Sequence, residues 1–183
     1  LMVEGAVHHL DILADLAGDL CDTIYAQTWN PAWGEFAGDS QGLVMMHFGN
    51  GSRAIYEGAK TNARGLNCWG QEYIRAECEG ATLILNRRQL VFYPYGMPRP
   101  APGTSPEEDG MLISLIEQEK WANTWLIEKF VRWLDGGEPM ETNVEDNLQS
   151  VALIFSAIES SRTGLPVKVQ EFLQQHRAAQ VMC

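Results

Sequence analysis

Six short strand-like runs follow one another along the first half of the chain, and no helical pattern separates them. Each run is rich in β-branched or aromatic residues and is bounded by Gly, Asn or Asp. The runs are Cys21–Trp29, Gly42–Phe48, Arg53–Ala59, Glu72–Glu79, Ala81–Asn86 and Gln89–Tyr93. Short connections join antiparallel neighbours, whereas parallel neighbours need a long crossover. The order therefore predicts an open, mostly antiparallel sheet of about six strands and argues against a doubly wound one.

The clearest turn signal lies between the second and third runs, in Phe48-Gly49-Asn50-Gly51-Ser52. Asn-Gly supplies the positive φ that tight hairpin loops require, at low energetic cost. This segment predicts a β-hairpin.

Both faces of the sheet are expected to be apolar, because Leu43–Phe48 and Val91–Tyr93 carry apolar residues on both alternating sides. Two later segments, from about Asp109 to Asp135 and from about Glu145 to Thr163, have helical apolar periodicity and can cover one face. Monomers rarely expose more than roughly 300 to 600 Å² of continuous apolar surface. We therefore expect an α+β fold with helices packed on one face, and a homodimer or higher homo-oligomer formed through the other.

A proline-rich segment from Pro94 to Pro106 holds five of the eight prolines and cannot form a helix or a central strand. It predicts either a flap that reaches a site or a neighbouring subunit, or an extended surface connection.

Composition limits the class of protein. The chain has 183 residues, of which 45% are hydrophobic and 20% charged, as expected for one soluble domain with a core. A net charge of -11 argues against nucleic acid and against an anionic membrane as partners. The four cysteines are dispersed and form no C-x-x-C pair, which favours a reducing, cytoplasmic location. No membrane span or secretory signal is evident.

The first residues predict a helix with one chemically active face. Glu4, His8 and Asp11 stand at i, i+4 and i+7, so a helix places two carboxylates and an imidazole on one side. Apolar residues recur on the opposite side, and Gly18 is a plausible helix end. The apolar residues are Val7, Leu10, Leu13, Ala14 and Ala17. A histidine between carboxylates can serve as general acid or base.

Two other interpretations of the triplet stay open at this point. Many amphipathic helices carry a solvent-facing polar row of this kind. Glu, His and Asp can also bind a transition metal or zinc, although no further ligand lies near in sequence, and we expect no metal site. His9 is offset from His8 by about 100° around a helix, so we interpret it as a packing or supporting residue.

Several spaced motifs in one order resemble the C-terminal domain of the Gfo/Idh/MocA oxidoreductases, over nearly the whole chain. The motifs are Val3 to Leu13 with Leu16-Ala17-Gly18, Phe48 to Gly51, Glu77 to Ile84, Glu145 to Leu148, Ala157 to Gly164 and Val167 to Val169. Members of that family pair an N-terminal dinucleotide-binding domain with a C-terminal α/β domain. The C-terminal domain carries an open sheet, supplies substrate contacts and usually forms the oligomer interface.

The resemblance implies an NAD(P)-dependent oxidoreductase that acts on a sugar, cyclitol or related polyol. A D-x-x-x-H pattern heads this helix in the family, and its histidine acts on the substrate hydroxyl. By match, His8 resembles the catalytic histidine and Asp11 resembles a substrate-contacting aspartate. Glu4 stands where the family commonly has Asp, so its carboxylate keeps the charge but sits one methylene further out.

Two elements of a complete enzyme are missing from the sequence. No G-x-G-x-x-G follows a strand, and no E-K-P element with its lysine occurs: Glu119-Lys120 is followed by Trp121, and Glu128-Lys129 by Phe130. We therefore expect residues 1–183 to form a single substrate-binding and oligomerisation domain without cofactor-binding residues. NAD or NADP would be bound by an N-terminal domain absent from this chain, which alone is expected to be inactive.

Further residues are candidates for the substrate pocket. Lys60 and Arg64, after the third run, could meet a hydroxyl-rich or acidic substrate, and an aromatic ring could stack on a sugar face. The aromatic candidates are Trp29, Trp33 and Trp69. The competing function is a non-catalytic ligand-binding or oligomerisation module with the same fold.

Overall fold

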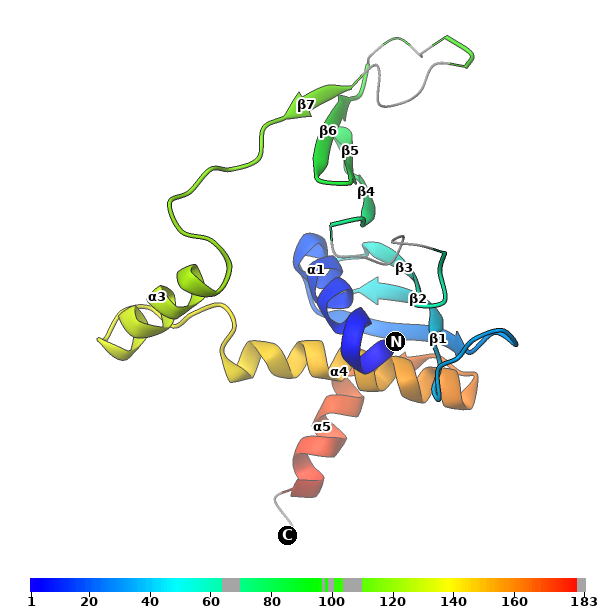
Figure 1. Ribbon diagram of the computed structural model, residues 1–183. Coiled ribbons are helices and arrows are strands. Elements are labelled where there is room, and N and C mark those ends of the chain that lie inside the picture. Colours follow the sequence, from blue (N-terminus) through cyan, green and yellow to red (C-terminus); the bar gives the residue numbers. More distant parts are fainter. Residues whose placement is uncertain (64–69, 97, 99–100, 104–109, 181–183) are drawn as a thin grey trace. The chain divides into compact units, whose positions relative to one another are not determined.

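The computed structural model describes residues 1–63, 70–96, 98, 101–103 and 110–180 (Figure 1). The chain divides into two compact units. Unit 1 comprises Leu1–Asn62 and Glu128–Cys183, and unit 2 comprises Ala63–Ile127. Both units are built on an antiparallel sheet, and with the helices they give the α+β class that the sequence predicts.

The sheet of unit 1 contains β1 (Cys21–Trp29), β2 (Gln41–Phe48), β3 (Arg53–Ala59) and β8 (Val167–Lys168), in the order β3-β2-β1-β8. All pairs are antiparallel. The predicted first and third strands have the observed bounds, and the second begins one residue earlier. Gly51, with φ of 91°, lies in the turn between β2 and β3, which confirms the predicted hairpin.

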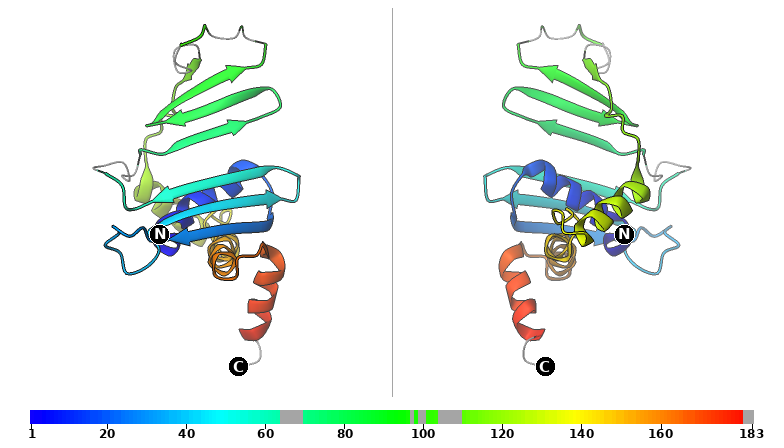
Figure 2. Two further views of the ribbon diagram at one scale, coloured as in Figure 1. Left: turned by 90° about the vertical axis from the view of Figure 1, so that its right-hand side faces the viewer. Right: turned by 90° about the vertical axis from the view of Figure 1, so that its left-hand side faces the viewer.

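Helices α1 (Val7–Ala17) and α4 (Val144–Thr163) pack on one face of this sheet, and α5 (Val169–Gln180) follows β8. In the left view of Figure 2 the strands lie in front of α1, and in the right view α1 lies in front of them. Strand residues alternate between the two faces, and in β2 every second side chain is buried. The fully buried large side chains that meet in the core are Leu10, Ile24, Val44, Met46, Phe48 and Val169.

Helix ends follow the local sequence. The side chain of Asn143 accepts hydrogen bonds from the backbone N–H groups of Glu145, at 2.9 Å, and Asp146, at 3.2 Å, and so begins α4. Gly164 ends α4 and Gly18 ends α1, both in the left-handed conformation that glycine adopts without strain. The predicted helix from about Glu145 to Thr163 is confirmed, as is the stop at Gly18.

The second half of β1 takes its outer hydrogen bonds from a helix and not from a strand. β8 pairs only with Thr23 and Ile24. Beyond them, the buried Ser160 of α4 accepts from the N–H of Ala26 at 3.0 Å, and Ser161 accepts from the N–H of Thr28 at 2.9 Å. The hydroxyl of Ser160 also donates to the carbonyl of Leu165, at 2.7 Å. Two serines thus satisfy backbone groups that would otherwise lack partners.

The sheet of unit 2 contains β4 (Tyr73–Glu77), β5 (Ala81–Asn86), β6 (Gln89–Pro94) and β7 (Met111–Ile113), in the order β4-β5-β6-β7. Its pairs are also antiparallel. The first three strands correspond to the last three predicted runs. The six predicted runs are therefore joined by two further strands, β7 and β8. These strands have only three and two residues, too few to show a pattern in the sequence.

The described strands form two four-stranded sheets instead of the predicted sheet of about six strands. The antiparallel direction follows from the short connections, whereas the division into two sheets depends on which edges pair. The hydrophobic pattern does not tell which strands are neighbours, because alternation marks the two faces of a strand and not the strand beside it.

The predicted helix from about Asp109 to Asp135 is wrong in its first half. Residues Met111–Ile113 form β7 against β6, where Leu112 lies opposite Val91, and helix α3 begins only at Ala122 and ends at Leu134. A short apolar run fits a strand or a helix equally well, and the free edge of β6 decides for the strand. Within the proline-rich segment, Pro94 ends β6, and residues 97, 99–100 and 104–106 lie outside the described residues.

The link between α4 and β1 predicts a difference between two buried serines. Ser160→Ala should lower the free energy of unfolding by about 1–3 kcal/mol, because it leaves the buried N–H of Ala26 without an acceptor. Ser156→Ala is the matched control: its hydroxyl is buried on the same helix and has no hydrogen-bond partner among the described residues. Urea unfolding followed by circular dichroism measures both, and equal losses would contradict this role of Ser160.

Candidate functional site

The helix at the start of the chain begins with one wide turn. Residues Met2–Ala6 form η1, a π-helical turn, in which the N–H groups of Gly5 and Ala6 both donate to the carbonyl of Leu1, at 2.9 and 3.2 Å. Helix α1 continues directly from it. Met2, Ala6 and Leu10 are buried against the sheet. Leu10 therefore lies on the core face of the helix, as the sequence predicts.

The predicted polar triplet lies on the exposed side of this helix: Glu4, His8 and Asp11 are all exposed. Glu4 belongs to the π-helical turn, and His8 and Asp11 belong to α1. Because a π turn holds more residues than an α turn, Glu4 is not in strict i, i+4 register with His8. Single π turns occur frequently at functional sites.

Glu4 and Lys60, two of the predicted site residues, form an ion pair. Lys60 directly follows β3, so the pair joins η1 to the end of that strand. The Glu4 side chain is 74% exposed and the Lys60 side chain 25%. In the structure the Glu4 carboxylate thus has a cationic partner. The sequence indicated only that Glu4 lies near His8.

Asp11 accepts a hydrogen bond from the hydroxyl of Ser150. Ser150 is buried on α4, so this contact fastens α1 to α4. Sequence analysis missed Ser150, although a serine at a core position of the apolar segment from Ser150 to Ile154 is itself a signal of a buried hydrogen bond. Asp11 therefore has a structural partner beside any role toward a substrate.

The two adjacent histidines have different surroundings. The ring of His9 stacks on Tyr56 of β3, with ring centroids 5.5 Å apart and an interplanar angle of 26°. Burial raises the pKa of Tyr56. The interpretation of His9 as a packing residue is confirmed, while His8 is exposed to solvent. Of these two neighbours, His8 is thus the more exposed.

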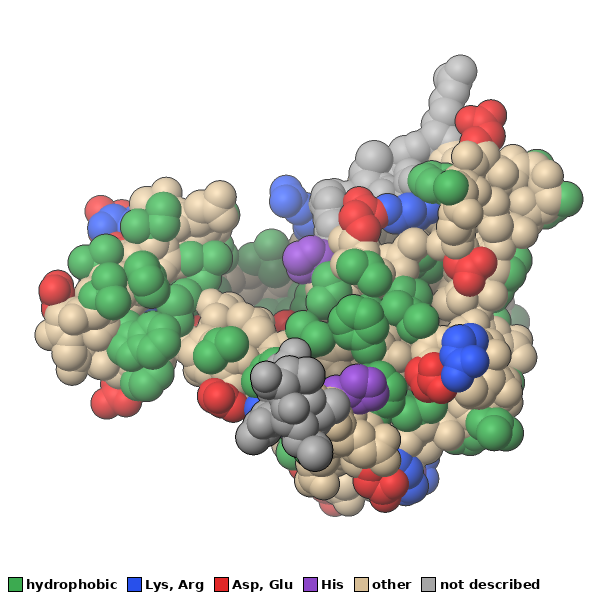
Figure 3. Space-filling model, turned by 90° about the horizontal axis from the view of Figure 1, so that it is seen from below, with side chains coloured by type: hydrophobic (Ala, Val, Ile, Leu, Met, Phe, Trp, Pro, Cys, Tyr) green, Lys and Arg blue, Asp and Glu red, His purple; other side chains and the backbone are tan. Residues whose placement is uncertain are grey.

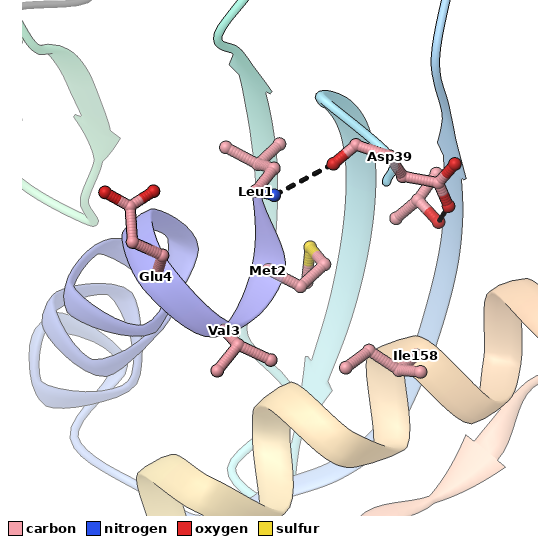
Figure 4. A pocket seen from close by; sticks show the side chains of 7 residues that line it. Leu1, Met2, Val3, Glu4, Asp39 and Ile158 are labelled. Atoms are coloured by element: carbon pink, nitrogen blue, oxygen red, sulfur yellow. Dashed lines mark hydrogen bonds between the residues drawn. The ribbon is translucent and has the colours of Figure 1, made fainter. Parts of the chain in front are cut away.

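A hollow of about 260 Å³ adjoins the π turn. Its lining residues are Leu1, Met2, Val3, Glu4, Thr28, Asp39 and Ile158. Figure 4 shows the Glu4 carboxylate on the opposite side of the turn from Val3, which points toward Ile158 of α4. The same figure shows the amino group of Leu1 donating to the carbonyl of Asp39, at 2.8 Å.

A second hollow, of about 290 Å³, lies against Lys60. Its lining residues are Trp33, Glu35, Phe36, Lys60, Thr61 and Asn62. Two predicted pocket residues, Lys60 and Trp33, are thus brought together. Trp29 is 39% exposed at the end of β1, and Arg64 and Trp69 lie outside the described residues.

The described residues include one buried free thiol, that of Cys21. Burial raises the pKa of the Cys21 thiol to about 11, so this cysteine is protonated at neutral pH and inert. Among residues 1–63 and the other described parts, no three His, Cys, Asp or Glu side chains are grouped so as to hold a metal ion.

The surface of the molecule shows how charged and hydrophobic side chains are distributed. On the face seen in Figure 3, Lys and Arg side chains lie apart from one another, whereas hydrophobic side chains gather together. No described helix is both long and apolar enough to cross a membrane.

The chain belongs to the oxidoreductase family whose C-terminal alpha/beta domain it matches over residues 1–169. This is the Gfo/Idh/MocA family that the spaced motifs resemble. A curated relative, the uncharacterized protein y4oX of Sinorhizobium fredii, is 53% identical over 178 residues, which are 97% of this chain and 49% of that protein. The chain thus spans about half the length of this relative.

Solved structures share the fold at low sequence identity. An oxidoreductase from Agrobacterium radiobacter, in complex with NAD+, L-tartaric acid and magnesium, matches with a TM-score of 0.71 and 18% identity, over 93% of this chain and 49% of that chain. An aldose-aldose oxidoreductase from Caulobacter crescentus, complexed with glycerol, matches with a TM-score of 0.71 and 15% identity, over 89% and 45%. Both likenesses concern the fold.

Proposed function

We propose that this chain is the substrate-side half of an NAD(P)-dependent oxidoreductase of the cytoplasm that acts on a sugar, cyclitol or related polyol. The observation that carries the proposal is the exposed His8, which heads α1 between the carboxylates of Glu4 and Asp11. The solved relatives with NAD+ and L-tartaric acid, and with glycerol, support the cofactor and the hydroxylated substrate class.

In this proposal His8 is the general acid and base. Its imidazole would accept the proton of the substrate hydroxyl during oxidation and return it to the carbonyl oxygen during reduction. Asp11, held by Ser150, would present its second carboxylate oxygen to the substrate. Glu4, whose carboxylate is paired with Lys60, would be a second substrate contact near the start of the helix.

The residues of this chain do not fit a dinucleotide. Gly49 and Gly51, the closest approach to a glycine-rich phosphate loop, lie in the β2–β3 hairpin and not between a strand and a helix. The chain's share of the chemistry is proton transfer and substrate positioning. Whether NAD or NADP is used, and in which direction the reaction runs, depends on residues beyond this domain.

Replacing His8 tests the proposed chemistry. In the protein reconstituted with its dinucleotide-binding half, His8→Asn should lower kcat by roughly 10²- to 10⁴-fold on the polyol that is turned over, because proton transfer is lost. His176→Asn is the matched control. This histidine is exposed, and among the described residues its ring contact is with Phe172 of its own helix. Unchanged turnover in His8→Asn would remove His8 from the mechanism.

Dinucleotide binding by the isolated chain gives a second test. Titration of this chain with NAD and with NADP, followed by calorimetry, should reveal weak binding at most, because the sequence contains no G-x-G-x-x-G loop. Micromolar affinity for either dinucleotide would contradict the assignment of the cofactor to another domain.

We further propose that the open face of the β1–β3 sheet forms a homodimer interface. The pairing register aligns Tyr25 of β1, Met45 of β2 and Ile55 of β3 in one row across the sheet. Met45 is 57% exposed and Ile55 is 72% exposed, while α1 and α4 pack on the other face. A row of apolar side chains, two of them exposed, on the face of the sheet away from the helices favours burial against a second copy.

Charge placed in this row should separate the subunits. Ile55→Glu should raise the dimer dissociation constant by roughly tenfold or more, as expected for a charge buried at an interface centre. Sedimentation velocity over a concentration series measures it. Leu16→Glu, at an apolar position on α1 that is 59% exposed, serves as control and should leave association unchanged. A monomeric wild-type chain at all concentrations would contradict the proposal.

A non-catalytic binding or oligomerisation module of the same fold is the second candidate. The contacts of Glu4 with Lys60 and of Asp11 with Ser150 favour it, because they give both carboxylates a structural role. The His8 experiment separates the two functions.

A further inference from the structure

The connection between β1 and β2 is held in one shape by its own polar groups. Ser40 is fully buried, and its hydroxyl donates to the side-chain oxygen of Asn30 at 2.6 Å. The amide of Asn30 in turn donates to the carbonyl of Phe36 at 2.8 Å. A buried hydroxyl and a side-chain amide thus tie both ends of the loop to its middle, which limits its conformational freedom.

Gly34 makes this shape possible. A Cβ at this position would lie 2.2 Å from the side-chain oxygen of Asn30, closer than any real contact, and 3.0 Å from the carbonyl of Pro31. The N–H of Gly34 donates to that carbonyl, at 2.8 Å. The loop therefore packs tightly on itself at this glycine.

The fixed loop displays large aromatic side chains to solvent. Trp33 is 76% exposed and Phe36 is 46% exposed. A loop that uses its polar groups internally and turns its aromatic rings outward is preorganised to bind something with an apolar face.

Polar groups of both signs line the same hollow as the aromatic rings. Lys60, Thr61 and Asn62 line the same hollow of about 290 Å³, together with Glu35 of the loop. The N–H of Lys60 donates to the carbonyl of Ser40, at 2.8 Å, so the polar wall is tied to the base of the loop. The Lys60 ammonium pairs with Glu4, which lies one turn before His8.

We propose that this hollow, defined by Trp33, Phe36, Glu35, Lys60 and Asn62, is a binding subsite for one sugar or cyclitol ring. The proposal rests on the proposed function and names the substrate class of the same site. The C–H bonds of one ring face stack on Trp33, whose π face is electron-rich, and the hydroxyls reach the carboxylate, ammonium and amide. The volume suits a ring of this size and is small for a protein segment.

Saturation-transfer NMR on this chain tests the subsite, with methyl β-D-glucopyranoside and myo-inositol as probes. We expect transfer to ring C–H protons, and a loss of affinity of about tenfold in Trp33→Ala. Trp33→Phe keeps an aromatic face and should retain most of the binding. Trp121→Ala removes another exposed tryptophan, 56% exposed and outside the hollow, and should bind as the wild type does.

Each other outcome overturns the proposal. Equal binding by Trp33→Ala places the ring elsewhere. No binding of either probe by the wild type, at the highest soluble concentration, removes the subsite but leaves the His8 turnover test standing. A change of sedimentation coefficient in Trp33→Ala with unchanged sugar binding makes the aromatic pair a protein contact. Gly34→Ala checks the loop: it should lose binding with Trp33 still present, because the Asn30 contact is broken.

Discussion

The contact between helix α4 and the second half of β1, which β8 does not reach, is the interaction on which unit 1 depends. The hydroxyls of Ser160 and Ser161 take the place of a neighbouring strand, because β8 is too short to pair with the whole of β1. This substitution fixes where α4 crosses the sheet. Helix α1 is then joined to α4 by the hydrogen bond between Asp11 and Ser150. The candidate site is therefore built on a helix whose place is set by backbone satisfaction as well as by apolar packing.

The three residues of the polar triplet have different surroundings in this arrangement of helices and strands. Glu4 and Asp11 each hold a partner from another element, Lys60 and Ser150 respectively. Both contacts position the helix, and both leave carboxylate oxygens that can accept further hydrogen bonds. His8 lies between them on the exposed side, while the neighbouring His9 is used in packing on Tyr56. In the proposed function His8 would thus transfer protons between two carboxylates that other elements hold in place.

Much of the fold and part of the site could be predicted from the sequence. Strand limits such as Arg53–Ala59 follow from β-branched runs bounded by turn residues, and Leu10 follows from helical spacing. What failed depends on tertiary pairing: Met111–Ile113 reads as helix or strand until the edge of β6 is known. The partners of Glu4 and Asp11 come from positions 56 and 139 residues further along the chain, a separation that no local pattern reports.

The chemistry and the recognition elements of unit 1 sit on different kinds of structure. The proposed proton transfer takes place on α1. The core face of this helix packs among buried residues such as Leu10, so the position of the helix tolerates little change. The aromatic rings sit on the β1–β2 loop, which is fixed by Asn30, Gly34 and the buried Ser40. In the proposed subsite, substitutions at Trp33 or Phe36 would change the contacts to the ring and leave α1 as it is. Placing the proposed ring contacts on a loop apart from the helix would let those contacts vary while the helix stays fixed, as with other binding loops on rigid scaffolds.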